Sequence, residues 1–234
     1  MLHRLEVSFN QQRRFVSDAA HELKTSVAVV KSSLQLVGMR ERTPQEYQAG
    51  NERALVDTAR IEEIVAKMLT LARFESASLS SQAAISNLNE CIRNVVSELE
   101  TVAAVRQVRL TVRDLPSGAS VPLSTEDCSI VAGNLIMNAI QHSPPQSCVE
   151  IYVLSRNGEI EFTVQDQGDG IDADVLPHVF ERFYRADPSR ARTTGGTGLG
   201  LAICKAAVER AGGSISLISS PGAGATATVR LPKT

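Results

Sequence analysis

The 234-residue sequence lacks any run close to the ~20 apolar residues that a membrane-spanning helix needs, and no secretory signal peptide is recognisable at its start. It also lacks an excess of charge, because its formal net charge is −2. A near-neutral chain gives no reason to expect nucleic acid or an anionic membrane surface as the main partner. The cysteines are scattered without the spacing of a metal site; they are Cys91, Cys128, Cys148 and Cys204. We therefore expect reduced thiols in a cytosolic setting.

The first part of the chain has helical periodicity throughout and predicts a first domain over residues 1–75. Apolar residues seven positions apart predict a long helix over residues 2–40; they are Leu2, Phe9, Val16, Leu23, Val30 and Val37. A second helix start is indicated by Thr43 as N-cap, Pro44 at the first helical position and Glu46 three residues after the cap. One face of this second helix is apolar, with Ile61, Ile64, Val65, Met68, Leu71 and Ala72.

Two long helices with a short connection make an antiparallel hairpin, and two helices cannot close a core alone. We therefore expect a symmetric homodimer in which two hairpins form a four-helix bundle. Helical phase is already present at Leu2 and Leu5, which suggests a helix that enters from an upstream region, and hence a fragment.

His21 lies in the middle of the first predicted helix, between acidic, basic and hydroxyl residues. If the seven-residue row of apolar residues is position a, His21 occupies position f, far from the seam of the bundle. The apolar stripe widens through Ala19, Ala20, Val27 and Leu34, and His21 lies beside it. A buried core histidine, the ordinary interpretation of a lone helical histidine, is therefore disfavoured, and we expect His21 to face solvent.

A stretch of small residues over 76–87 predicts a linker, and the pattern beyond it predicts a second domain over 88–234. Helices are expected over residues 88–106, 124–142 and 199–211. Strands are expected over residues 108–112, 120–122, 149–155, 159–165, 214–218 and 225–231. Helices with a largely antiparallel sheet make a two-layer sandwich.

Three polar or glycine-rich segments of the second domain point to chemistry. Asn134 and Asn138 share one face of a predicted helix although asparagine is a mediocre helix former. That face is either a polar solvent face or a source of carboxamide oxygen for Mg²⁺. The segment VQDQGDGID places Asp166 at the end of a strand, before Gly168 and Gly170. It is either an ordinary turn or a carboxylate that accepts a hydrogen bond from an exocyclic amine such as that of adenine.

The third segment is TTGGTGLGLAICKA, in which glycines lead directly into a predicted helix; they are Gly195, Gly196, Gly198 and Gly200. Backbone N–H groups and the positive end of a helix suit a polyphosphate, although the cluster could also be a flexible loop. The segment lacks the lysine of a P-loop and the preceding strand of a Rossmann turn.

The whole chain resembles the catalytic half of a sensor histidine kinase of two-component signalling. FVSDAAHELKT is similar to the H box of that family, NLIMNAIQHS to the N box, and DQGDGI to the G1 box. VFERFYRAD is similar to the F box, GGTGLGLAI to the G2 box, and SSPGAGATATVRLP to the closing glycine motif. All six motifs stand in the family order.

The resemblance implies an α+β multidomain protein: a helical hairpin that forms a dimeric four-helix bundle, then a two-layer α/β sandwich. The sandwich is expected to have the GHKL (Bergerat) ATP-binding fold of gyrase, Hsp90 and MutL. The implied activity is ATP- and Mg²⁺-dependent autophosphorylation of a histidine, followed by transfer to an aspartate on the receiver domain of a response regulator. The chain is expected to be the cytoplasmic portion of an inner-membrane sensor whose membrane region is absent from this sequence.

Roles follow from the family motifs residue by residue. His21 resembles the phosphoacceptor, and Glu22 the acid that hydrogen-bonds its other ring nitrogen. Thr25 resembles the hydroxyl that positions water for dephosphorylation of the regulator, and back-bonding to the His21 carbonyl is the alternative for it. Asn138 matches the Mg²⁺ ligand.

The remaining implied roles concern the nucleotide. Asn134 matches a supporting polar contact, Asp166 the adenine acceptor and Arg185 a basic residue at the phosphates. Phe180 and Phe183 resemble aromatic anchors of a lid over residues 184–197. The loops around the nucleotide match Gly168, Gly170, Gly196, Gly198, Leu199 and Gly200.

Two positions depart from the family pattern. Ser26 stands where a proline usually bends the helix below the histidine, so we expect a straighter helix. Gln141 stands where a basic residue is common, which predicts modestly weaker nucleotide binding. The alternatives are a degenerate nucleotide-binding scaffold, which has no need of His21, Glu22, Asn138 and Asp166 together, and a GHKL-type ATPase, which leaves the H-box hairpin unexplained.

Overall fold

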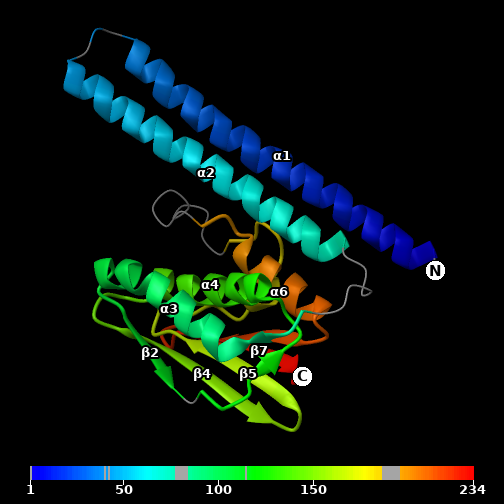
Figure 1. Ribbon diagram of the computed structural model, residues 1–234. Helices are drawn as coiled ribbons and strands as arrows, with labels where there is room; N and C mark the ends of the chain where they lie inside the picture. The colour runs from blue at the N-terminus through cyan, green and yellow to red at the C-terminus, as the bar shows by residue number, and fades with distance from the viewer. Residues whose placement is uncertain (1, 40, 42, 77–83, 114, 186–195) are drawn as a thin grey trace. The chain divides into compact units, whose positions relative to one another are not determined.

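The protein divides into two compact units, Met1–Thr70 and Leu71–Thr234 (Figure 1). The computed structural model describes residues 2–39, 41, 43–76, 84–113, 115–185 and 196–234, with side chains described from Val16 onward. The predicted linker over 76–87 falls partly outside these residues. The compact division lies between Thr70 and Leu71, so the last turn of the second helix belongs to the second unit.

The first unit is the predicted helical hairpin. Helix α1 spans Leu2–Gly38 and helix α2 begins at Pro44 and continues to Ser76. The predicted capping box is present: the Thr43 backbone N donates to Glu46 Oε2 at 2.9 Å, and the Glu46 backbone N donates to Thr43 Oγ1 at 3.3 Å. Helix α1 runs unbroken through Ser26, in agreement with the missing proline.

The hairpin presents an apolar groove of about 520 Å³ on its surface. Both helices contribute to it, with Val27, Val30 and Leu34 from α1 and Ile61 from α2. Val27 and Leu34 are each about half exposed, although both are large and apolar. The predicted apolar stripe therefore remains largely uncovered in a single chain.

The second unit contains a five-stranded sheet with the strand order β2-β4-β5-β7-β6. Its strands are β2 (Arg109–Arg113), β4 (Cys148–Arg156), β5 (Glu159–Gln165), β6 (Ser214–Ser219) and β7 (Ala225–Pro232). The β2–β4 pair is parallel and the other pairs are antiparallel. A separate antiparallel pair joins β1 (Ser86–Asn87) to β3 (Ser120–Val121).

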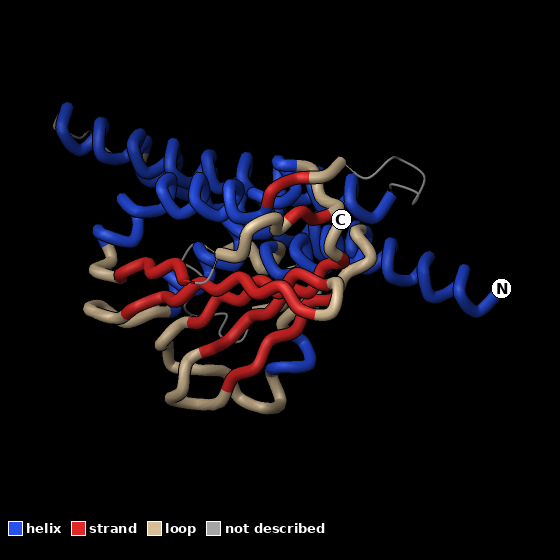
Figure 2. The backbone as a smooth tube through the Cα atoms, turned by 60° about the horizontal axis from the view of Figure 1, so that its bottom comes forward, coloured by secondary structure: helices blue, strands red, loops and turns tan. Residues whose placement is uncertain are grey.

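Three helices cover one face of the sheet (Figures 1 and 2). They are α3 (Leu88–Val105), α4 (Thr125–His142) and α6 (Gly200–Arg210), and α4 packs between the other two. Alternate residues of β4 and β5 point towards this layer and are fully buried, among them Ile151 and Phe162. Ile136 and Ile140 meet them from α4 and are equally buried. The predicted two-layer α/β sandwich is confirmed.

The sequence predicted these helices and strands to within about two residues, but it missed three features. It placed β1 inside the linker, and it foresaw neither the 3₁₀ helix Leu176–His178 nor the meeting of Cys91 with Cys128. All four cysteines are free thiols, as expected. Nevertheless Cys91 and Cys128 meet in the fold, where a hydrogen bond between them lowers the pKa of Cys91 to about 7 and raises the pKa of Cys128.

Among the helices that the structure describes, none combines the length and apolar character needed to cross a bilayer. This finding agrees with the absence of a long apolar run in the sequence.

Candidate functional site

The hairpin candidates His21, Glu22 and Thr25 lie together on α1. His21 is exposed, as the apolar register predicts, and Glu22 is half-buried beside it. Thr25 Oγ1 donates to the His21 carbonyl oxygen at 2.9 Å, so the back-bonding alternative for this hydroxyl is present in the structure. The hydroxyl oxygen still has lone pairs for an incoming donor such as water.

Helix α4 positions the two asparagines. Its start is capped by Ser124, whose Oγ accepts from the Asp127 backbone N at 3.0 Å. The buried side of the helix carries Leu135, Ile136, Ala139 and Ile140, which leaves Asn134 and Asn138 on a half-buried face. Because these two residues are four apart, their side chains are neighbours along one row of the helix.

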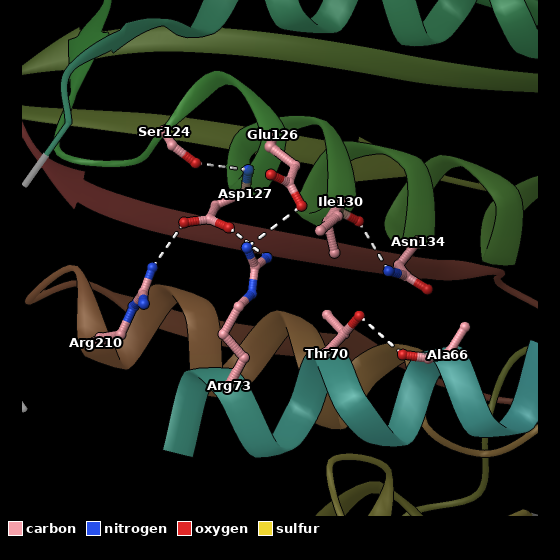
Figure 3. Close-up of polar contacts among 9 residues, drawn as sticks. All are labelled: Ala66, Thr70, Arg73, Ser124, Glu126, Asp127, Ile130, Asn134 and Arg210. Atoms are coloured by element: carbon pink, nitrogen blue, oxygen red, sulfur yellow. Dashed lines mark hydrogen bonds and ion pairs between the residues drawn. The ribbon is translucent and has the colours of Figure 1, made fainter. Parts of the chain in front are cut away.

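The Asn134 amide is held through its nitrogen, and its oxygen lies close to Gly200. Its Nδ2 donates to the Ile130 carbonyl at 2.8 Å, and a Cβ added at Gly200 would stand only 2.8 Å from its Oδ1 (Figure 3). The asparagine helix and the start of the glycine-rich helix α6 therefore touch, as expected if both line one site. Asn138 has its half-buried amide one turn further along.

Asp166 directly follows β5 and is 7% exposed. Its Oδ1 accepts from the Gly168 backbone N at 2.8 Å and from the Ala225 backbone N at 3.0 Å. Within the part of the chain that the structure describes, no partner is found for Oδ2. One oxygen thus fixes the carboxylate and the other is left to accept a hydrogen bond from a ligand.

Gly170 and Gly198 are required by backbone geometry. Gly170 has a φ of 76°, and a Cβ there would meet the Ser220 carbonyl. Gly198 has a φ of 69°, and a Cβ there would stand 2.7 Å from the Phe183 carbonyl carbon. Both positions therefore exclude a side chain on two independent grounds.

Contacts at the base of the predicted lid join its two ends. The Phe183 backbone N donates to the Gly198 carbonyl at 2.9 Å, and the Arg185 guanidinium donates to the Gly196 carbonyl. The lid itself, predicted over 184–197, falls mostly on residues 186–195, which lie outside the described residues. Gly195 is one of these residues.

Helix α6 presents the start of its backbone without a side-chain cap. Leu199 is the N-cap residue and is fully buried, and no side chain among the described residues caps the helix with a hydrogen bond. The first N–H groups of α6 and its positive dipole end are consequently available to an anion. The Asn134 amide against Gly200 places this helix start beside the asparagine face.

One positioning residue was not predicted from the sequence. Ser219 Oγ accepts from the Ile171 backbone N at 2.9 Å and donates to the Gly224 carbonyl at 2.6 Å. It therefore ties the loop after Asp166 to the turn before β7. A serine at a strand end has no distinctive pattern, so the sequence held no signal for this role.

The candidate residues suit ATP and Mg²⁺ in chemical type. Asp166 has an acceptor for an amine, and α6 has donors for phosphate oxygens. Asn138 has a carboxamide oxygen, a hard ligand of the type that suits a Mg²⁺ ion bound mainly by phosphates and water. The described residues hold no cluster of three or more His, Cys, Asp or Glu side chains that could bind a metal by themselves.

Comparisons with known proteins find matches to both parts of the chain. The family model described as "His Kinase A (phospho-acceptor) domain" matches residues 11–77, and "Histidine kinase-, DNA gyrase B-, and HSP90-like ATPase" matches residues 124–234. The sensor-like histidine kinase SenX3 of Mycolicibacterium smegmatis is 34% identical over 223 residues, which cover 95% of this chain and 58% of that protein. The chain spans about half the length of the curated relatives that it matches.

Two solved structures share the fold. The Acinetobacter baumannii histidine kinase AdeS has a TM-score of 0.72 at 18% identity, with 92% of this chain and 98% of that chain covered. The histidine kinase ThkA, solved in complex with the response regulator TrrA, has a TM-score of 0.74 at 17% identity, with 100% and 67% covered. At these identities the likeness concerns the fold alone.

Gly196 and Gly198 of the GTGLG segment should respond differently to alanine. Gly198→Ala is expected to lower the free energy of unfolding of the second unit by about 1–3 kcal/mol, because the methyl group adds backbone strain and a clash. Gly196→Ala is the matched control, since a Cβ there would approach only an Arg185 nitrogen at 3.9 Å. Urea denaturation of both variants measures the difference, and equal effects would contradict the geometry at Gly198.

Proposed function

Because this chain belongs to the sensor histidine kinase family, we propose that it transfers the γ-phosphate of ATP to His21 and then to an aspartate of a response regulator. The observation that carries this proposal is the Asp166 carboxylate, which is held by two backbone N–H groups through one oxygen and keeps the other as an acceptor. An exposed histidine in the matched phosphoacceptor segment supplies the second half of the reaction.

Different residues of the second unit bind different parts of the nucleotide. Asp166 Oδ2 accepts from the exocyclic amine of adenine, and a carbonyl oxygen at the same place, as in guanine, would be repelled by the carboxylate. The uncapped start of α6 and Arg185 meet the phosphate oxygens. Asn138 holds Mg²⁺, which when bound neutralises charge on the phosphates during transfer.

The residues of the hairpin supply the acceptor. A His21 ring nitrogen provides the lone pair that attacks phosphorus, and exposure leaves it open to approach. Glu22, next in the chain, accepts a hydrogen bond from the other ring N–H. Its negative charge offsets the positive charge that develops on the ring. The partner of Glu22 in this step is the ring nitrogen that does not attack.

The apolar groove of the hairpin supports a homodimer. Its lining by Val27, Val30, Leu34 and Ile61 leaves a face that a second hairpin would cover, and this would complete a four-helix bundle. A response regulator is the proposed second partner, because the similar kinase ThkA was solved in complex with one. Attachment of the full-length protein to the inner membrane, with this chain on its cytoplasmic side, belongs to the same proposal.

His21→Gln is expected to abolish incorporation of acid-labile label from γ-labelled ATP with Mg²⁺. Binding of ATP should stay unchanged, because the acceptor and the nucleotide-binding residues lie in different compact units. Labelling and equilibrium ATP binding measured on the same preparation test both statements. Acid-labile label that persists in His21→Gln would show that another residue is the acceptor, and an ATPase without phosphohistidine would leave the wild type unlabelled.

Asp166→Asn and Asn138→Ala are expected to fail in different ways. Asp166→Asn can keep both backbone hydrogen bonds through its Oδ1, but it turns the free acceptor into an N–H donor that faces the adenine amine. ATP affinity should fall about 10- to 100-fold, the effect of losing a hydrogen bond to a charged group. Asn138→Ala should lose transfer, and Mg²⁺ titration should no longer change the affinity for nucleotide. Wild-type binding of ATP–Mg²⁺ by both variants would place the nucleotide elsewhere.

Thr25→Ala is expected to separate two activities. The hydroxyl can orient a water molecule in line with the aspartyl-phosphate of the regulator, whereas autophosphorylation needs only the imidazole, Glu22 and the nucleotide. Dephosphorylation of the regulator, followed with added kinase and ADP, should slow while phosphohistidine formation continues. If Thr25 only caps the His21 carbonyl, as its hydrogen bond allows, both activities will change equally or not at all.

A further inference from the structure

The loop that carries Asp166 begins where β5 stops pairing with β4. The last pair of that ladder is Glu150 opposite Gln165. Continued by two residues on each strand, the same register places Cys148 opposite Gln167. A hydrogen bond is found at this place, but it uses a side chain: the Cys148 backbone N donates to Gln167 Oε1 at 3.0 Å. At the start of β4, the Gln167 side chain therefore accepts the hydrogen bond that a neighbouring strand would accept with a backbone carbonyl.

This side-chain hydrogen bond allows the loop backbone to turn away from the sheet. The Gly168 backbone N donates to Asp166 Oδ1 at 2.8 Å, and Gly170 has a φ of 76°, which no strand adopts. A Cβ added at Gly168 would stand only 2.5 Å from the His142 carbonyl oxygen, so the loop backbone runs directly against the end of α4. The Gln167 side chain thus keeps the loop attached to β4 while its backbone leaves the ladder.

The loop is held from two sides. On one side the Asp166 backbone N donates to the Ala225 carbonyl at 2.9 Å, and Asp166 Oδ1 accepts from the Ala225 backbone N at 3.0 Å. Ser219 ties a later part of the loop to the same turn before β7. On the other side the hydrogen bond from Cys148 to Gln167 ties the loop to β4, the strand that follows α4 in the chain. The second attachment therefore relates the loop to the helix that carries the two asparagines.

The relation between this loop and α4 bears on the proposed function, on which the present inference rests. In that function Asp166 accepts from the adenine amine, and Asn138 on α4 holds Mg²⁺ at the phosphates. A carboxylate distinguishes bases well only if its acceptor oxygen is already held where the amine arrives. We propose that Gln167 is a positioning residue for base recognition, which holds Asp166 Oδ2 in place relative to α4 through its hydrogen bond to β4. In this role Gln167 acts through its neighbour and needs no contact with the nucleotide.

Gln167→Ala tests this role when the full chain binds two nucleotides in the presence of Mg²⁺. They are ATP and purine riboside 5′-triphosphate, which has the same phosphates and sugar but lacks the exocyclic amine. The wild type should bind ATP more tightly, and Gln167→Ala should reduce this advantage about two- to fivefold, the effect of weakening one hydrogen bond. Affinity for purine riboside triphosphate should stay unchanged. The ratio of the two dissociation constants is the measurement, because changes at the phosphates or in the folded fraction cancel in it.

Three further variants isolate the hydrogen bond. Gln167→Met has a similar length but no acceptor, and it should reduce the ratio as Gln167→Ala does. Gln167→Glu keeps an acceptor oxygen at the same reach and should retain the wild-type ratio, since its added charge acts on both nucleotides alike. Gln165→Ala is the matched control and should also retain the ratio. Gln165 is an exposed glutamine at the end of β5, and its side chain has no hydrogen bond among the described residues.

The outcomes separate this inference from the function on which it rests. A wild-type ratio in Gln167→Ala would overturn the positioning role, whether or not both affinities fall. A ratio reduced equally in Gln167→Glu or in Gln165→Ala would show that the hydrogen bond to Cys148 is not the cause, and would overturn it too. A wild type that binds the two nucleotides equally would instead overturn the adenine contact of Asp166, and the inference with it.

Discussion

The burial of α4 is the constraint on which the second unit depends. Leu135, Ile136, Ala139 and Ile140 are packed against the sheet and the neighbouring helices, and each large apolar side chain contributes about 1.5–3 kcal/mol by leaving water. A rotation of α4 would expose this side, so the helix has one orientation. Its other positions are then fixed by the 3.6-residue repeat, which puts Asn134 and Asn138 on the half-buried face and Asp127 at the capped start.

At Asp166, one oxygen of the carboxylate has a structural partner, and the other is the acceptor proposed for the ligand. Its Oδ1 joins the Gly168 backbone to the Ala225 backbone, two segments that are far apart in the chain. The second oxygen is thereby held in place before any ligand arrives. A group that is already oriented loses little freedom on binding, which favours affinity and discrimination between bases.

The end of α2 belongs to the second unit, although it continues the helix of the hairpin. By sequence this turn is the last part of a helix whose earlier residues face the hairpin, but Leu71 and Phe74 are buried in the second unit. Asp127 can accept it because Arg210 already neutralises the carboxylate.

The sequence by itself determined the helices, the strands, the capping box at Thr43 and the exposure of His21, because each depends on local periodicity or on neighbours within one turn. It also determined the residue types of the nucleotide site through motifs whose chemistry is readable in isolation. Roles for His21, Thr25, Asn138 and the other candidates stay predictions. Only the tertiary structure decided that Cys91 meets Cys128, that Asn134 rests on Gly200 and that Arg73 and Arg210 share Asp127. These partners are separated by tens of residues, and no local pattern records a pairing that the packing of whole elements brings about.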